Sequence, residues 1–125
     1  PDYQPGGAPL TQPEQLHQAD LIHILGRPIY WGLAEEALGL EGLNLKGGLR
    51  TSGNNLALEL AVLGLGCVML PSSVVQRYLD RGLLVEPFDI EVKSPWCYFT
   101  RCKERSATPS VKAFYAWMLQ AADVG

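Results

Sequence analysis

The sequence is poor in cysteine, in histidine and in positive charge. Its three cysteines among 125 residues show no CxxC spacing, which argues against a disulfide framework and favours reduced thiols in a cytosol. Ten Lys and Arg stand against 13 Asp and Glu, and no two basic residues are adjacent, so the chain lacks the basic stripe that neutralises nucleic-acid phosphates. The longest apolar run, residues 60–71, contains two glycines and is too short to cross a bilayer. We therefore expect no DNA binding by this segment, no membrane span and a cytoplasmic location.

Apolar residues, in contrast, are abundant. They make up 47% of the chain, which is enough for a core without disulfides or metal, and the length fits one small domain or part of one. The composition is that of a folded chain and not of a disordered one. The chain starts at Pro1 without an initiator methionine, which is compatible with the loss of a targeting segment or of a whole upstream domain.

Short apolar runs bounded by Gly and Pro alternate along the chain with segments of helical periodicity. We predict strands at residues 21–25, 43–46, 67–70, 83–85 and 96–100, and helices at residues 11–17, 29–38, 55–63, 72–80 and 109–122. The run at 67–70 is apolar throughout, as in the interior strands of parallel sheets. This order indicates an α/β fold of three αβα layers around a mainly parallel sheet, in which ligands bind at the carboxyl ends of the strands.

The predicted helix at 55–63 is apolar almost all round, because only Asn55 and Glu59 are strongly polar. Such a helix is expected to be covered on more than one side. The cover is either core between the sheet and a neighbouring element, or a subunit face.

Sequence signatures of enzymes are absent. The chain has no GxxxxGK[ST] phosphate loop and no GxSxG elbow, and its Gly64 and Gly66 match only two glycines of the dinucleotide fingerprint. The only histidines are His17 and His23, and His23 lies in an apolar run, where a hydrogen-bonded structural role fits better than a base or a metal ligand. Cys67 is expected to act as a small buried apolar residue. We therefore predict no catalysis, no metal and no cofactor.

One polar cluster has a chemistry of its own, and it consists of Thr51, Ser52, Gly53, Asn54 and Asn55. These residues place hydroxyls, amides and free backbone N–H groups at a predicted helix start, where the positive end of the helix dipole favours a carboxylate or a similar anion. The alternative is ordinary helix capping, for which Ser and Asn are common residues. The glycine slightly favours a ligand, because it leaves the backbone uncovered.

The order of several short motifs is similar to that of a known family. The motifs are residues 1–3 (PDY), 9–10 (PL), 13–16 (PEQL), 21–23 (LIH), 49–54 (LRTSGN), 61–66 (AVLGLG), 69–71 (MLP), 82–88 (GLLVEPF) and 114–118 (FYAWM). Together they resemble the effector-binding domain of LysR-type transcriptional regulators over nearly the whole chain. Trp31, with Gly39 and Leu40 after it, and residues 87–92 (PFDIEV) suggest the branch that contains the glycine-cleavage and β-lactamase activators.

The resemblance implies a regulator with an N-terminal winged helix-turn-helix, a linker helix and two α/β subdomains like those of type II periplasmic binding proteins. Residues 1–10 would be a linker or crossover, residues 11–93 the second subdomain, and residues 94–125 the returning strand and last helix of the first. The rest of the first subdomain and the DNA-binding domain would be absent. The strand and helix at the C-terminal end would then lack their sheet partners, so we expect a homo-oligomer, either a dimer or a swapped arrangement.

The implied function is non-catalytic sensing of a small effector, anionic in character, in a cleft between the two subdomains, with DNA bound only through the missing domain. The residues implied are Thr51, Ser52 and Asn54 as effector contacts, His23 and Gly26 as lining of the cleft, Trp31 as its wall, and Tyr98 near the crossover. For Tyr98, a cleft contact and hinge packing are alternatives.

Two other interpretations stay open from the sequence. A fragment of a periplasmic solute-binding protein shares the fold, so the fold alone does not decide between sensing and solute binding. An upstream secretory signal would favour the solute-binding protein, and an upstream helix-turn-helix would favour the regulator. A small α/β enzyme would need a catalytic constellation, and we find none in the sequence.

Overall fold

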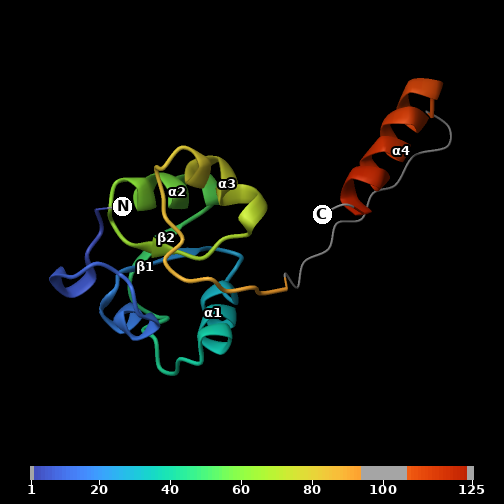
Figure 1. The fold of residues 1–125 in the computed structure, drawn as a ribbon. Coiled ribbons are helices and arrows are strands. Elements are labelled where there is room, and N and C mark those ends of the chain that lie inside the picture. Colours follow the sequence, from blue (N-terminus) through green and yellow to red (C-terminus); the bar gives the residue numbers. More distant parts are fainter. Residues whose placement is uncertain (1, 94–106, 124–125) are drawn as a thin grey trace. The chain divides into compact units, whose positions relative to one another are not determined.

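The computed structural model describes residues 2–93 and 107–123, which belong to two separate units, Pro1–Ser94 and Pro95–Gly125. The first unit contains η1 (Pro5–Gly7), η2 (Pro13–Gln18), β1 (Leu21–Ile24), α1 (Tyr30–Leu38), β2 (Leu49–Thr51), α2 (Asn54–Val62), β3 (Cys67–Val68) and α3 (Ser72–Asp80) (Figure 1). The second unit contains α4 (Pro109–Asp123). No helix of the described ranges is both long enough and apolar enough to span a membrane.

The three strands form one sheet in the order β2-β1-β3, with β1 in the centre. Both pairings are parallel: Ile24 of β1 is aligned with Thr51 of β2, and Leu21 is aligned with Cys67 of β3. The predicted parallel sheet is therefore confirmed. The apolar sequence LIHI explains why β1 is central, because both of its faces are covered.

Helices cover the two faces of the sheet, as the alternation of side chains along β1 requires. Leu21 packs in one cluster with Trp31 and Ala34 of α1, whereas Ile22 packs in another with Ala57 of α2. The clusters lie on opposite faces because residues 21 and 22 point in opposite directions. The first unit thus has the predicted order of layers, with α1 on one side of the strands and α2 on the other (Figure 1).

The strand predicted at residues 43–46 does not form. Its second half is a turn, in which Asn44 Oδ1 accepts a hydrogen bond of 3.0 Å from the N–H of Gly47. Gly48 follows with a φ of 83°, and a Cβ at this position would collide with the carbonyl oxygen of Leu21 in β1. Only a glycine at position 48 allows the backbone to lie this close to β1. The strand β2 then begins at the next residue, Leu49.

The strand predicted at residues 83–85 is also wrong. The N–H groups of Leu83 and Leu84 both donate to the carbonyl oxygen of Tyr78, at 2.9 and 3.3 Å, so this segment closes the C-terminal end of α3. The apolar content of residues 83–85 alone was therefore not sufficient to predict a strand. The strand predicted at residues 96–100 lies outside the described residues.

The predicted helices are confirmed with shifts of one or two residues at their ends, and the helix predicted at residues 11–17 is the 3-10 helix η2. Gly39 ends α1 as its C-cap residue, with a φ of 67°. The N-cap residue of η2 is Gln12, and Gln15 Oε1 accepts the backbone N–H groups of both Thr11 and Gln12 at 2.7 Å.

The expected cover over α2 is only partly present. This helix buries Ala57, Leu58 and Ala61 but leaves Leu56 52% exposed, and Leu63 just after it 71% exposed. Within the first unit, α2 is therefore covered on one side and not all round.

Candidate functional site

The carboxyl ends of β1 and β2 meet at one edge of the sheet. Ile24 and Thr51 are partners in the parallel ladder, and the N–H of Leu25 donates to the carbonyl oxygen of Thr51 at 2.8 Å. The loop containing Gly26 follows β1, and Ser52 follows β2, so both loops leave the sheet at this edge. The structure therefore brings the two predicted loop segments together at the edge where open α/β sheets bind ligands.

Thr51 and Ser52 have different environments although they are neighbours. Thr51 is 3% exposed, and its hydroxyl donates to the carbonyl oxygen of Gly53 at 3.1 Å. Ser52 is exposed, and Asn54 is half-buried as the first residue of α2. Thr51 thus holds the turn from inside, while Ser52 and Asn54 offer a hydroxyl and an amide at the surface.

The N-terminus of α2 lacks a capping side chain. Its N-cap residue is Gly53, which lies within the predicted capping segment but carries no side chain to accept the first N–H groups. The first intrahelical bond runs from the N–H of Ala57 to the carbonyl oxygen of Gly53, at 3.2 Å, so the three preceding N–H groups have no intrahelical acceptor. These groups and the helix dipole favour an anion at this position.

The structure separates His23 from this cluster. His23 precedes Ile24, the ladder partner of Thr51, so its side chain points to the opposite face of the sheet from that of Thr51. His23 is half-buried, and its Nε2 is buried without a hydrogen-bond partner among the described residues. Burial lowers the pKa of His23, and the positive charge of Arg50 lowers it further, while a hydrogen bond with the backbone of Gly47 raises it.

The lowered pKa of His23 makes the stability of the chain depend on pH. Below the ordinary value of 6.5, the unfolded chain binds a proton at this residue that the folded chain does not bind. The stabilisation is therefore fully present above pH 6.5 and is lost as the pH falls through the lowered pKa. We expect the free energy of unfolding, measured with urea, to decrease between about pH 7.5 and about pH 5, and His23→Gln to reduce this decrease.

The control for this prediction is the other histidine. His17 is exposed on η2, and His17→Gln should keep the pH dependence of the unmodified chain. If His23→Gln also kept it, the burial of His23 would not be the cause.

The structure places Trp31 in the core. Its indole is 6% exposed, packs with Leu16 and Leu43, and donates from Nε1 to the carbonyl oxygen of Ile22 at 3.0 Å. The side chain thus presents little surface to a ligand. Tyr98 lies outside the described residues.

Arg50 places a positive charge beside His23, which the sequence motifs did not predict. Arg50 is the ladder partner of His23, and its Nη2 donates to the carbonyl oxygen of Lys46 at 2.9 Å. The signal that identifies Arg50 is the register of β1 against β2, which the sequence motifs do not contain.

The described residues contain neither a metal-binding cluster nor an activated thiol. Among residues 2–93 and 107–123, no cluster of three or more His, Cys, Asp or Glu is arranged to hold a metal ion. Cys67 is half-buried against the α1 side of the core, and burial, helped by the charge of Asp20, raises its pKa to about 11. The thiol therefore stays protonated near neutral pH, as expected for an apolar packing residue.

Comparison with known proteins identifies relatives of this chain. The family model described as the LysR substrate binding domain matches residues 1–123. The HTH-type transcriptional activator AmpR of Providencia stuartii is 34% identical over 110 residues, which cover 88% of this chain and 37% of the activator. The glycine cleavage system transcriptional activator of Escherichia coli K12 is 29% identical over 115 residues, which cover 91% of this chain and 37% of that protein.

A solved structure has the same fold. The effector domain of the transcriptional regulator AmpR of Pseudomonas aeruginosa matches with a TM-score of 0.77 and 30% identity, covering 92% of this chain and 55% of that domain. The predicted α/β fold of the type II periplasmic-binding-protein kind is therefore confirmed. The chain nevertheless spans only 37% of the length of the curated relatives described above.

Proposed function

Because the chain belongs to the LysR substrate-binding domain family, as its motifs predict, we propose that it binds a small anionic effector as part of a transcriptional regulator. One observation supports an anionic effector. The N-terminus of α2 lies at the carboxyl edge of the sheet without a capping side chain. Ser52 and Asn54 contact the effector from this edge, and Thr51 holds the turn that presents them. Gly26 belongs to the loop on the neighbouring strand.

The roles of the remaining predicted residues differ in their support. His23 points to the opposite face of β1 with its Nε2 buried, so its proposed part in the cleft is to hold the end of β1 and not to contact the effector. Trp31 lies in the core and donates to the carbonyl oxygen of Ile22, so it supports the central strand and is not an open wall. Tyr98 keeps its proposed place near the crossover between subdomains.

The proposed function is tested in cells with the intact regulator gene. Ser52→Ala combined with Asn54→Ala removes the exposed hydroxyl and the half-buried amide but none of the buried side chains of α2. The regulator should therefore be made at normal levels but should not respond to its effector. Messenger-RNA sequencing should show that most transcripts changed by deleting the gene change in the same direction in this variant.

A matched control keeps the fold and alters another exposed polar residue. Gln76→Ala lies on α3, away from the sheet edge, and should leave the transcript profile as in the unmodified strain. If the double variant also matched the unmodified strain while the deletion did not, Ser52 and Asn54 would not be effector contacts.

The relatives named above are transcriptional regulators, and the function proposed for this chain is accordingly non-catalytic, cytoplasmic and free of cofactors. In the whole protein, DNA would be bound by an N-terminal domain outside this chain. Residues 11–93 would form the second effector-binding subdomain, with residues 1–10 as crossover and residues 94–125 as a contribution to the first.

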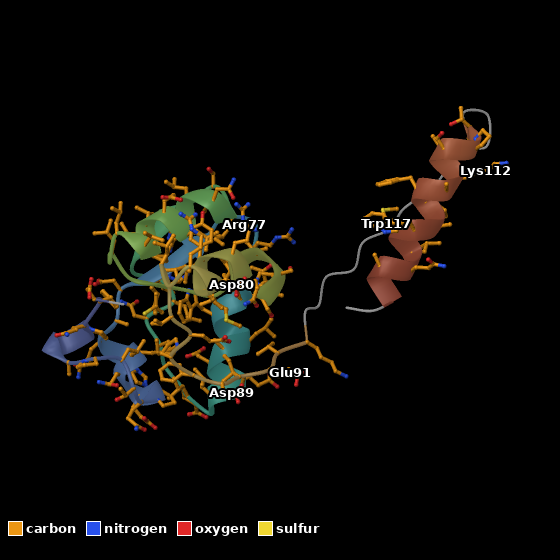
Figure 2. The ribbon with its side chains drawn as sticks, turned by 45° about the horizontal axis from the view of Figure 1, so that its top comes forward. Arg77, Asp80, Asp89, Glu91, Lys112 and Trp117 are labelled. Carbon is orange, nitrogen blue, oxygen red and sulfur yellow. The ribbon has the colours of Figure 1, made fainter. Side chains whose placement is uncertain are left out.

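A homo-oligomer is the second part of the proposal. Strand β2 is an edge of the sheet, and its Leu49 is 42% exposed. In the other unit, α4 carries Trp117 (Figure 2), and Phe114 and Trp117 are each 61% exposed. Their ring centroids are 5.6 Å apart. Light scattering should therefore give at least twice the chain mass of 13.7 kDa, and a monomer would contradict this part.

A further inference from the structure

A groove between α2 and α3 is not used by the proposed effector site. It lies at the C-terminal half of α2, whereas the effector site lies at the N-terminus of the same helix. Its volume is about 320 Å³, and it is lined by Glu59 and Val62 from α2 and by Arg77, Tyr78, Arg81 and Leu83 from α3 and the turn after it. This size is within the range of small-molecule sites.

Two guanidinium groups converge on this groove. Arg77 lies in α3 and Arg81 is the C-cap residue that follows it, and both side chains line the groove beside α2. The hydrogen bond to Glu59 raises the pKa of Tyr78, and the positive charges of Arg77 and Arg81 lower it, so both guanidiniums lie within electrostatic range of the phenol. Within the described part of the chain, neither guanidinium forms an ion pair or a hydrogen bond.

Glu59 supplies the carboxylate of the groove, and this carboxylate already accepts one hydrogen bond. Tyr78 donates its hydroxyl to Glu59 Oε1 at 3.1 Å, which ties α3 to α2 and fixes the carboxylate at one side. One negative charge against two positive charges leaves the groove with one net positive charge. Val62 and Leu83, both half-buried, supply the apolar part of the lining.

We propose that this groove is a second ligand site, which takes an amphipathic monoanion whose carboxylate lies on Arg77 and Arg81 and whose hydrocarbon part packs on Val62 and Leu83. A guanidinium matches a carboxylate by two parallel hydrogen bonds, and two guanidiniums at one groove supply more donors than one carboxylate needs. The apolar lining selects against small hydrated anions. The Glu59 charge selects against dianions, which would be repelled by it.

The test is a titration of the ¹⁵N-labelled 125-residue chain with hexanoate at low salt, followed by two-dimensional NMR. We expect amide shifts at Glu59, Val62, Tyr78 and Leu83. Acetate lacks the hydrocarbon part, and hexylammonium has the opposite charge, so both should bind at least about ten-fold more weakly. Equal binding of hexylammonium, or shifts confined to residues 51–54, would overturn the proposal.

Removing positive or negative charge from the groove should change the hexanoate affinity in opposite directions. Arg77→Gln with Arg81→Gln should weaken hexanoate binding at least about ten-fold, whereas Glu59→Gln should tighten it several-fold by removing the negative charge. Lys46→Gln with Lys93→Gln removes the same charge at exposed positions outside the groove and should change the affinity less than about two-fold. The proposal fails if the arginine pair and the lysine pair have equal effects.

Discussion

Gly48→Ala should destabilise the first unit by about 3 kcal/mol or more, which is enough to unfold much of a small domain of ordinary stability. Two costs add at this position. Gly48 has a φ of 83°, a conformation that is strained for any residue with a Cβ, and that Cβ would collide with the carbonyl oxygen of Leu21. Leu21 belongs to the central strand, so the collision cannot be relieved without moving β2 away from β1. Urea denaturation followed by circular dichroism measures the loss.

Gly42→Ala separates the two costs. Gly42 has a similar φ of 76°, but nothing lies within 4 Å of the position where its Cβ would be built. This variant should lose only about 1 kcal/mol, the cost of the strained backbone. Equal losses in the two variants would mean that the close approach of Gly48 to Leu21 contributes nothing.

The contrast between residues 43–46 and 49–51 shows where sequence prediction of the fold stops. The segment LNLK alternates apolar and polar residues like a strand, yet Asn44 bonds to Gly47 and turns the chain. The segment LRT has no such pattern and becomes β2, because Gly48 lets the backbone reach β1. Local periodicity predicted the helices well, since their hydrogen bonds are local, but strand pairing depends on residues far apart in the chain.

The candidate site was predictable to a similar depth. The polar residues 51–54 and the helix start after them are visible in the sequence, and the strand-end rule places them at a ligand-binding edge. The direction of His23 was not visible, because it depends on the register of Ile24 against Thr51. The grouping of Arg77 and Arg81 with Glu59 in one groove was missed for the same reason, since it requires α3 to lie beside α2.

Trp31 illustrates how one residue type supports two interpretations. From the sequence, Trp31 fits the core or an interface better than a binding site. The family resemblance, in contrast, implies that it walls the cleft. The structure shows the indole buried and bonded to the carbonyl oxygen of Ile22, at the point where α1 meets the central strand. A wall residue would affect ligand affinity, whereas a core residue affects stability first.

We expect Trp31→Ala to lower the free energy of unfolding by about 3–5 kcal/mol, because it leaves a large cavity between α1 and β1 and removes the Nε1 hydrogen bond. Trp31→Phe keeps most of the volume and should lose about 1–2 kcal/mol. Leu63→Ala, at a side chain that is 71% exposed, is the control and should change stability by less than about 0.5 kcal/mol. A Trp31→Ala chain as stable as the Leu63→Ala chain would restore the cleft-wall role, because the indole would then contribute nothing to the packing of α1 on β1.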